Sequence, residues 1–457
     1  MGMMRVRTNV RGGRRDGAVL IVTIWVVLTL AGLVLVSAGA AKSFTATSRN
    51  HAMDVRADVA AEGGIALAKA IVDGAVDDTG LYEAVEIADS YCWFIKMDME
   101  SEGGIAYGLE DLGGRVNLNT ATREMLLALP EMTEAIADAI IDWRDTDDEL
   151  SPMGAENEYY MQLDEPYQCK NDRFESVEEL LLVKGVTREL LFGEDYNQNG
   201  LLDLNEDDGD GMLPRDDKDG VLDYGWAVYL TVDSQHPNVS ANGEERVNVN
   251  ERQNRRLEQL LLNKLESSSR AQLVYNLART RRPFSNIFDF YQKTTLTREE
   301  FALIADLITT SDEGMLLGRI NINTAPYHVL MTLPGFESSD AYSVIFTRNN
   351  ARESTGAGEG DTDITWLLDA VTTEKAVNIG GLVTGVSMQY QADLVVLNRS
   401  GYGYTRRLVV LDRSDGVTRV LRHQNMSHLG WPLDPVYLSG LRASQSMIDL
   451  HDEVKYK

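Results

Sequence analysis

Gly114-Arg115-Val116-Asn117-Leu118-Asn119-Thr120-Ala121 recurs further along the chain as Gly318-Arg319-Ile320-Asn321-Ile322-Asn323-Thr324-Ala325. The two copies stay in register without a gap through three more identical pairs: Leu126 and Leu330, Leu129 and Leu333, and Pro130 and Pro334. A shorter third copy is Arg246-Val247-Asn248-Val249-Asn250. Self-similarity of this kind indicates a structural unit that the chain uses more than once.

Each long copy predicts a pair of short helices joined by a turn. We expect Asn119-Thr120 and Asn323-Thr324 to cap the first helix, because their side chains can accept backbone N–H bonds. Proline after Leu129 ends that helix, and apolar residues at helical spacing then predict a second one: Ile136, Ile140 and Trp143. A further short hairpin is predicted from Phe174–Leu180 and Val183–Val186. The centre of the chain is therefore predicted to be a helix-hairpin-helix (SAM-like) domain.

Upstream of the repeats, Arg14-Arg15-Asp16-Gly17 runs directly into residues 18–41, which carry no charge. As a helix this stretch is about 36 Å long, enough to cross a hydrocarbon core of about 30 Å. The leader holds five arginines against one aspartate, so the positive-inside rule keeps it in the cytoplasm and exports the remainder. The sequence predicts a single-pass inner-membrane protein with a periplasmic C-terminal part.

Three interpretations of this N-terminus compete. The first is a secretory signal cleaved at the A-x-A site Ala38-Gly39-Ala40, although its apolar region is longer than usual. The second is an uncleaved anchor. The third is a prepilin-type signal, cut after Gly17 so that Ala18 begins a retained apolar helix. We favour the third, because a basic leader, a glycine and an immediate apolar helix resemble the type IV pilin and pseudopilin class.

The exported part is strongly acidic. Residues 42–457 hold 38 lysines and arginines against 70 aspartates and glutamates, a net charge of −32. Such a surface suits divalent cations or basic partners rather than phosphates. The two cysteines, Cys92 and Cys169, could pair in an oxidising periplasm or remain free thiols.

The segments around the repeats predict a long helix and a small sheet. The helical pattern continues past the membrane stretch to about Asp73, and Tyr91–Ile95 reads as a strand. Three β-rich segments separated by tight turns predict antiparallel strands: Met388–Leu397, Tyr402–Leu411 and Val417–Arg422. The predicted fold class is α+β, with a long N-terminal transmembrane and amphipathic helix, a small antiparallel sheet and a large inserted α-helical domain.

The predicted organisation follows from these segments. It comprises a leader (1–17), a transmembrane helix (18–41), a pseudopilin helix with first strands (42–113), an inserted helical domain (114–345) with an acidic loop (195–223), and a C-terminal part with antiparallel strands (346–457).

The stretch Asp195–Glu206 matches the calcium-loop pattern D-x-[DN]-x-[DN]-G-x5-E at every specified position. Calcium takes six to eight hard oxygen ligands around a tight loop. The predicted ligands are Asp195, Asn197, Asn199, Leu201 through its carbonyl, Asp203 and Glu206, and Gly200 permits the sharp turn. The predicted role of Ca²⁺ is structural, and the alternative is a plain acidic turn. A second ion could bind among the aspartates that follow, but its ligands cannot be assigned.

A second acidic cluster contains Asp145, Asp147, Asp148, Glu149 and Glu156. We expect it to be a solvated acidic loop after a helix, and a calcium site is the minority alternative.

No enzyme motif occurs: the sequence lacks G-x-S-x-G, H-E-x-x-H and a P-loop. Two other functions compete. Helical hairpins can bind DNA backbone, but the net charge opposes this and Leu129-Pro130-Glu131-Met132 lacks the glycine that lets backbone amides approach phosphate. A membrane-anchored, calcium-dependent adhesin is the third alternative. We predict that the protein is not an enzyme and does not bind nucleic acid.

Taken together, the chain resembles the K-type minor pseudopilin of type II secretion systems. The residues that carry the resemblance occur in the family's order: Gly17-Ala18, Gly114–Asn119, Asp142–Asp145, Gly154–Glu156, Glu165–Tyr167, Glu175–Leu180, Ile320–Pro326 and Tyr404–Leu408. Val22 stands where most pilin-like proteins have glutamate, a loss typical of the K type. Residues 190–310 look like an enlargement of the usual pattern.

This resemblance implies a function in assembly. It implies cleavage and N-methylation by a prepilin peptidase, and a place at the pseudopilus tip with the I- and J-type minor pseudopilins, where K-type subunits start and cap assembly on the inner-membrane platform. The absence of glutamate at residue 22 fits this place. In the family that side chain is thought to contact the N-terminus of the subunit above it in the membrane, and a tip subunit has no such neighbour.

Overall fold

A computed structural model describes residues 16–76, 79–97, 104–209, 211–355 and 362–455. The predicted leader therefore lies outside the described residues, apart from the backbone of Asp16 and Gly17 at the start of the first helix.

Helix α1 (Asp16–Val72) is continuous and about 86 Å long. It is the one described helix long and apolar enough to cross a membrane, and its large apolar side chains between Val19 and Val36 are exposed. Its second half packs on the sheet through Ala57, Ala60, Ala61, Ile65 and Ala68. Gly63-Gly64 does not break the helix: a Cβ on Gly64 would lie 2.9 Å from Leu394, so glycine allows close packing there.

The sheet has the order β1-β2-β13-β14-β15, with β3 paired to β2 and β4 paired to β13, and all pairs are antiparallel. Its strands are β1 (Val85–Ile87), β2 (Ser90–Met97), β3 (Ile105–Tyr107), β4 (Glu110–Asp111), β13 (Gln389–Asn398), β14 (Tyr404–Asp412) and β15 (Arg419–Asn425). The predicted C-terminal strands and the strand at Tyr91–Ile95 are confirmed. The predicted α+β fold class is also confirmed.

Alternation along β13 gives the sheet two buried faces. Leu394 and Val396 face α1, whereas Val395 and Leu397 face a second apolar cluster. The C-terminal helices α14 (Pro435–Arg442) and α15 (Met447–Lys455) cover that second face. Cys92 lies in the core under α1 and Cys169 in the core of the inserted part, so the two thiols are separate, buried and free.

The chain leaves the sheet after β4 and returns at β13, its direct neighbour. Asp111 of β4 links the start of the insert to its last repeat and to the segment that returns to the sheet. Its Oδ2 accepts hydrogen bonds from Ser387 Oγ (2.7 Å), Thr324 Oγ1 (2.5 Å) and Asn321 Nδ2 (3.1 Å). The predicted boundary at 345/346 falls inside helix α11 (Ser338–Thr355), and Leu367, Ile379 and Val383 belong to the core of the inserted part. The insert therefore extends to about residue 387, further than predicted.

Three repeats form the insert, and each is closed by a two-stranded parallel ladder between its first and last strand. β5 (Val116–Asn117) pairs with β6 (Leu230–Thr231), β8 (Val247–Asn248) with β9 (Ile308–Thr309), and β11 (Ile320–Asn321) with β12 (Val383–Thr384). We refer to residues 116–231, 247–309 and 320–384 as the first, second and third repeat. The short sequence copy at 246–250 thus begins a complete structural unit.

The helices of the repeats are short. The first contains α2 (Arg123–Leu127), α3 (Glu134–Arg144), α4 (Asn157–Tyr160) and α5 (Arg188–Phe192). The second contains α6 (Arg255–Lys264), α7 (Ser268–Arg281), α8 (Ile287–Thr294) and α9 (Arg298–Ala302). The third contains α10 (Tyr327–Leu330), α11, α12 (Leu367–Ala370) and α13 (Thr373–Ile379). Between repeats, β7 (Gln235–Pro237) pairs antiparallel with β10 (Met315–Leu317).

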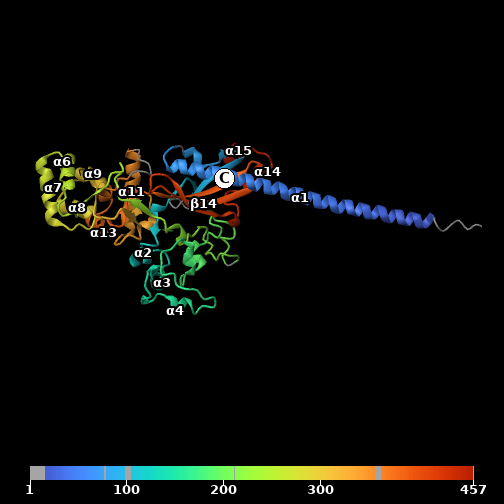
Figure 1. Cartoon of the computed structure of the whole chain (residues 1–457), viewed down its shortest axis with the longest axis horizontal. Helices are drawn as coiled ribbons and strands as arrows, with labels where there is room; N and C mark the ends of the chain where they lie inside the picture. The colour runs from blue at the N-terminus through green and yellow to red at the C-terminus, as the bar shows by residue number, and fades with distance from the viewer. Residues whose placement is uncertain (1–15, 77–78, 98–103, 210, 356–361, 456–457) are drawn as a thin grey trace, which may run out of the picture.

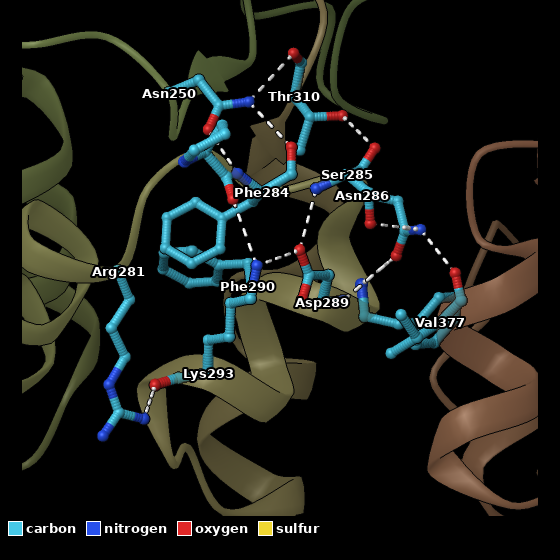
Figure 2. A network of polar contacts seen from close by, with 12 residues as sticks. Asn250, Arg281, Phe284, Ser285, Asn286, Asp289, Phe290, Lys293, Thr310 and Val377 are labelled. Atoms are coloured by element: carbon cyan, nitrogen blue, oxygen red, sulfur yellow. Dashed lines mark hydrogen bonds and ion pairs between the residues drawn. The ribbon is translucent and has the colours of Figure 1, made fainter.

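The repeated asparagines hold each repeat together instead of capping helices as predicted. Asn119 donates to the Phe174 carbonyl (3.1 Å) and accepts from its amide (2.7 Å). Figure 2 shows the same pair of bonds between Asn250 and Phe284, at 2.9 and 2.8 Å. The cap of α2 is Thr122, one turn later than expected, because the Asn119 side chain is engaged across the repeat.

The insert extends away from the free part of α1. In Figure 1 the apolar half of α1 projects to one side of the sheet, and helices α6–α9 of the second repeat lie at the opposite end of the molecule. Asn286 ties that end to the third repeat, since its Nδ2 donates to the Val377 carbonyl at 2.7 Å (Figure 2).

We predict that Asp111→Ala destabilises the protein by about 2 to 4 kcal/mol, because it leaves the donors of Ser387, Thr324 and Asn321 without their acceptor. Urea denaturation of the full chain in detergent, followed by tryptophan fluorescence, measures the change. The exposed control Asp172→Ala should stay within about 0.5 kcal/mol of wild type. Equal stability of the two variants would show that Asp111 does not join insert and sheet.

Candidate functional site

The acidic segment 193–224 is closed at its base. It starts where α5 ends at Gly193, whose positive φ of 67° turns the chain. Gly193 bridges Tyr224, and the Glu194 amide donates to the Asp223 carbonyl at 2.9 Å. The buried Glu194 carboxylate accepts from the amides of Asp217 (3.3 Å) and Asp223 (3.1 Å). Both ends of the segment are thus fixed to the first repeat.

Within this base, residues 195–206 form a tight loop. Asp195 accepts from the amides of Asn199 (2.9 Å) and Gly200 (2.8 Å), and Gly200 has the positive φ, 73°, that the motif requires. Glu206 accepts from the amides of Tyr196 (2.9 Å) and Asp203 (3.0 Å). The first and last predicted ligands therefore organise the loop backbone from both sides.

The polar side chains of the loop converge. Asn197 and Asn199 both donate to Asp203 Oδ2, at 2.6 and 3.2 Å, and Asn197 Oδ1 is buried without a hydrogen-bond donor in the described chain. The sixth predicted ligand, the carbonyl of Leu201, follows directly after Gly200. Within the described residues, no group of three or more His, Cys, Asp and Glu side chains is placed to hold a metal by itself. A cation here needs the amide and backbone oxygens as well.

The carboxylates of the loop are buried at a high electrostatic cost. Asp195 and Glu206 are each 1% exposed. Burial raises the pKa of Glu206 to about 7, and the neighbouring Asp195 and Asp203 charges add to the shift. Burial also raises the pKa of Asp195. A set of hard oxygens that lacks compensating charge fits a hard divalent cation such as Ca²⁺.

A buried arginine fastens the loop to the sheet. Arg406 of β14 donates to the Asn197 carbonyl at 3.1 Å and to the Gln198 carbonyl. The same guanidinium pairs with Asp393 of β13 at 2.5 Å, and the Arg406 side chain is 3% exposed. The Arg406 guanidinium therefore binds both the sheet and the loop.

The second acidic cluster is partly buried, contrary to the expected solvated loop. Asp147, Asp148 and Glu149 are exposed, but Asp142 is 0% and Glu156 6% exposed. Both oxygens of Glu156 are buried and accept no hydrogen bond in the described chain. Burial raises the pKa of Glu156 to about 7, with a further contribution from Asp142.

Glycine 154 brings the two buried carboxylates of this cluster together. A Cβ at Gly154 would overlap Asp142 Oδ2, so only glycine allows the chain to pass so close to that carboxylate. Asp145 Oδ1 is also buried without a donor.

Comparison with known proteins identifies part of the insert. Residues 114–192, which contain the second acidic cluster, match the family model described as type II secretion system, protein K. Residues 114–192 thus form a domain similar to type II secretion protein K. The match confirms the resemblance to the K type that the sequence predicts.

Two further comparisons accompany this match. No curated protein matches the chain. A solved structure described as the GspK-GspI-GspJ complex from the type 2 secretion system of enterotoxigenic Escherichia coli shares 13% identity with it. The similarity covers 72% of this chain and 82% of that chain, with a TM-score of 0.34.

The acidic segment is also held by residues whose role sequence reasoning missed. Glu194 directly precedes the calcium-type motif and lies outside the pattern. Arg406 belongs to the matched run Tyr404–Leu408, but its contact with the loop spans more than two hundred residues of sequence. No local pattern signals such a contact.

We predict that Arg406→Met exposes the acidic segment to trypsin at Arg215 and Lys218, with cleavage at least about tenfold faster. Removing one partner of a buried ion pair costs about 3–5 kcal/mol, and the loop also loses the donors to its two carbonyls. Timed digestion followed by mass spectrometry measures the rate.

The neighbouring Arg407→Met is the matched control, because Arg407 pairs with the half-exposed Asp58. It should cleave at the wild-type rate. If both variants cleave alike, Arg406 does not hold the segment.

Proposed function

We propose that this chain is a minor pseudopilin anchored in the inner membrane, which starts and caps the type II secretion pseudopilus. The observation that carries the proposal is the place of the protein K domain: it is inserted between neighbouring strands of a sheet that packs on a long helix with an apolar free half. The apolar half supplies the membrane anchor, and the sheet supplies the subunit body.

The shape of the insert supports a capping position. In Figure 1 the second and third repeats lie on the far side of the sheet from the free part of α1, and the first repeat lies below the sheet. A subunit that stacked above this one along the helix direction would meet the insert first. Because Asp111 of the sheet binds the third repeat and Arg406 binds the loop of the first, the insert cannot move aside without losing hydrogen bonds. Growth of the filament then continues only beneath this subunit.

The proposed partners follow from this position. The I- and J-type minor pseudopilins would pack against α1 at the tip, and a prepilin peptidase would cut after Gly17 and methylate Ala18. The inner-membrane assembly platform would receive the complex. Val22 supports the terminal place, because an apolar residue there has no charge to offer to a neighbour's N-terminus in the membrane.

We predict that Gly17→Val blocks processing and abolishes type II secretion, because the peptidase needs a small residue before the cut. Intact-mass measurement of the purified chain should give a wild-type start at N-methyl-Ala18 and an uncut variant. Gly39→Val is the matched control, since nothing lies within 4 Å of that position, and it should be processed and secrete normally. A wild-type start at Met1 or Ala41 would overturn the proposal.

We also propose that Ca²⁺ binds the loop 195–206 through Asp195, Asn197, Asn199, Leu201, Asp203 and Glu206. The buried carboxylates and the unpaired Asn197 oxygen support this proposal. The ion would neutralise Asp195 and Glu206 and so strengthen the loop that Arg406 fastens to the sheet. Its role is to hold the insert at a fixed angle to the subunit body.

The second acidic cluster supports a further proposed Ca²⁺ position beside Glu156, which backbone oxygens would have to complete, because no three acidic side chains of the described residues converge there. The unpartnered oxygens of the buried Glu156 are the observation that favours it over a solvated loop. Two ions would then brace the first repeat, one at each of its acidic turns.

We predict that Ca²⁺ raises the melting temperature of the full chain by a few degrees, since a tenfold excess over Kd adds about 1.4 kcal/mol of stability per site. Glu206→Ala and Glu156→Ala should each remove part of the rise and together all of it. The exposed control Glu453→Ala should keep it in full. Calcium titration followed by scanning calorimetry measures the shift, and an unchanged wild-type melting curve would exclude both sites.

A further inference from the structure

The three repeats share a fold but differ sharply in charge. The first repeat holds 8 lysines and arginines against 29 aspartates and glutamates, and the third holds 3 against 8. The second repeat holds 10 against 7 and is the basic one. Within a chain of net charge −28, a net positive repeat is a marked departure. Because the fold is the same, the core does not require this charge.

Five arginines of the second repeat gather where α6 begins and α7 ends. Arg282 places them together, since its guanidinium donates to the carbonyls of Glu251, Arg252 (3.2 Å) and Arg279 (3.5 Å). Arg281 donates to the Lys293 carbonyl at 2.5 Å, and Figure 2 shows it extended along the surface. Arg255 opens α6, one turn after Arg252. We call these residues the arginine patch: Arg252, Arg255, Arg279, Arg281 and Arg282.

No described carboxylate forms an ion pair with the arginine patch. Four of the other five basic residues of the repeat are matched: Arg256 pairs with Glu245, Arg270 with Glu300, Lys293 with Asp289, and Arg298 with Asp369. Lys264 is exposed at the far end of α6. Arg252, Arg255 and Arg279 are exposed, and their side chains make no hydrogen bond within the described residues. Placing Arg279 and Arg281 at the C-terminus of α7 favours the helix dipole. That benefit does not explain Arg252 and Arg255, which lie at the unfavourable N-terminus of α6.

The position of the patch restricts what it can meet. The second repeat lies at the opposite end of the molecule from the apolar half of α1, so the bilayer that α1 crosses is remote (Figure 1). A nucleic acid that extended beyond the second repeat would meet the neighbouring third repeat, which holds 3 basic against 8 acidic residues, and its phosphates would be repelled there. The turn between α6 and α7, Leu265-Glu266-Ser267, also has no glycine and carries an acidic residue. A short acidic segment of a protein can bind the arginine patch without reaching the acidic surfaces beside it.

We propose that the arginine patch is a docking site for an acidic segment of a partner protein, presented by the second repeat at the end of the molecule farthest from the membrane. Guanidinium groups bind carboxylates through paired N–H donors, so a cluster of five suits a run of glutamates or aspartates. The acidic remainder of the chain repels acidic proteins elsewhere and directs such a segment to this one surface.

The test measures binding of a fluorescent peptide of about eight glutamates to the full chain in neutral detergent, by anisotropy at low and moderate salt. We expect binding that weakens as salt rises. The triple variant Arg252→Ala/Arg255→Ala/Arg279→Ala should bind at least about tenfold more weakly. These residues make no side-chain bonds, so the variant should melt at the wild-type temperature.

A second triple variant controls for net charge. Arg173→Ala/Lys264→Ala/Arg419→Ala removes three exposed positive charges outside the patch and should bind within about twofold of wild type. If both triple variants lose peptide affinity equally, net charge alone explains the binding, and the proposal is overturned. Absence of wild-type binding to the peptide would also overturn it, as would tighter, patch-dependent binding of a short DNA duplex.

Discussion

The carboxylate of Asp111 connects the two halves of this molecule. It stands at the last residue before the chain leaves the sheet and binds Thr324 and Asn321 of the third repeat together with Ser387, which precedes the returning strand. The entrance and exit of an insert of more than 250 residues are thereby joined, because they lie side by side on β4 and β13. The orientation of the repeats, on which the proposed capping position rests, depends on this joint.

The three repeats are closed by the same hydrogen-bonding pattern, but their surfaces differ in charge. In each, the first and last strands pair in parallel, and an asparagine two residues further bonds across the repeat. The apolar core needs only the Leu, Ile and Val positions, so exposed residues were free to diverge. The first repeat became the acidic, cation-seeking part and the second the basic part. Charge separation between units of one fold indicates separate binding roles.

The acidic loop and the sheet are coupled through Arg406. Its guanidinium neutralises Asp393 in the sheet and holds two carbonyls of the loop, while Asp195 and Glu206 stay buried behind it. One arginine cannot compensate all of these carboxylates. The buried carboxylates of the loop therefore carry negative charge that Arg406 alone does not balance. A bound cation would supply the missing positive charge. With the proposed cation bound, the loop would be a fixed contact between the insert and the subunit body.

The sequence by itself determined the local features: the apolar helix, the three C-terminal strands and the turn at Gly200. These depend on periodicity and on residues close in the chain. Tertiary structure decided the rest. The ladders join segments that are distant in sequence, Asn119 contacts Phe174 instead of capping a helix, α11 runs through the predicted domain boundary, and Glu156 is buried rather than solvated. Each of these depends on which remote surface covers a residue, and hydrophobic burial and long-range hydrogen bonds settle that only when the whole chain folds.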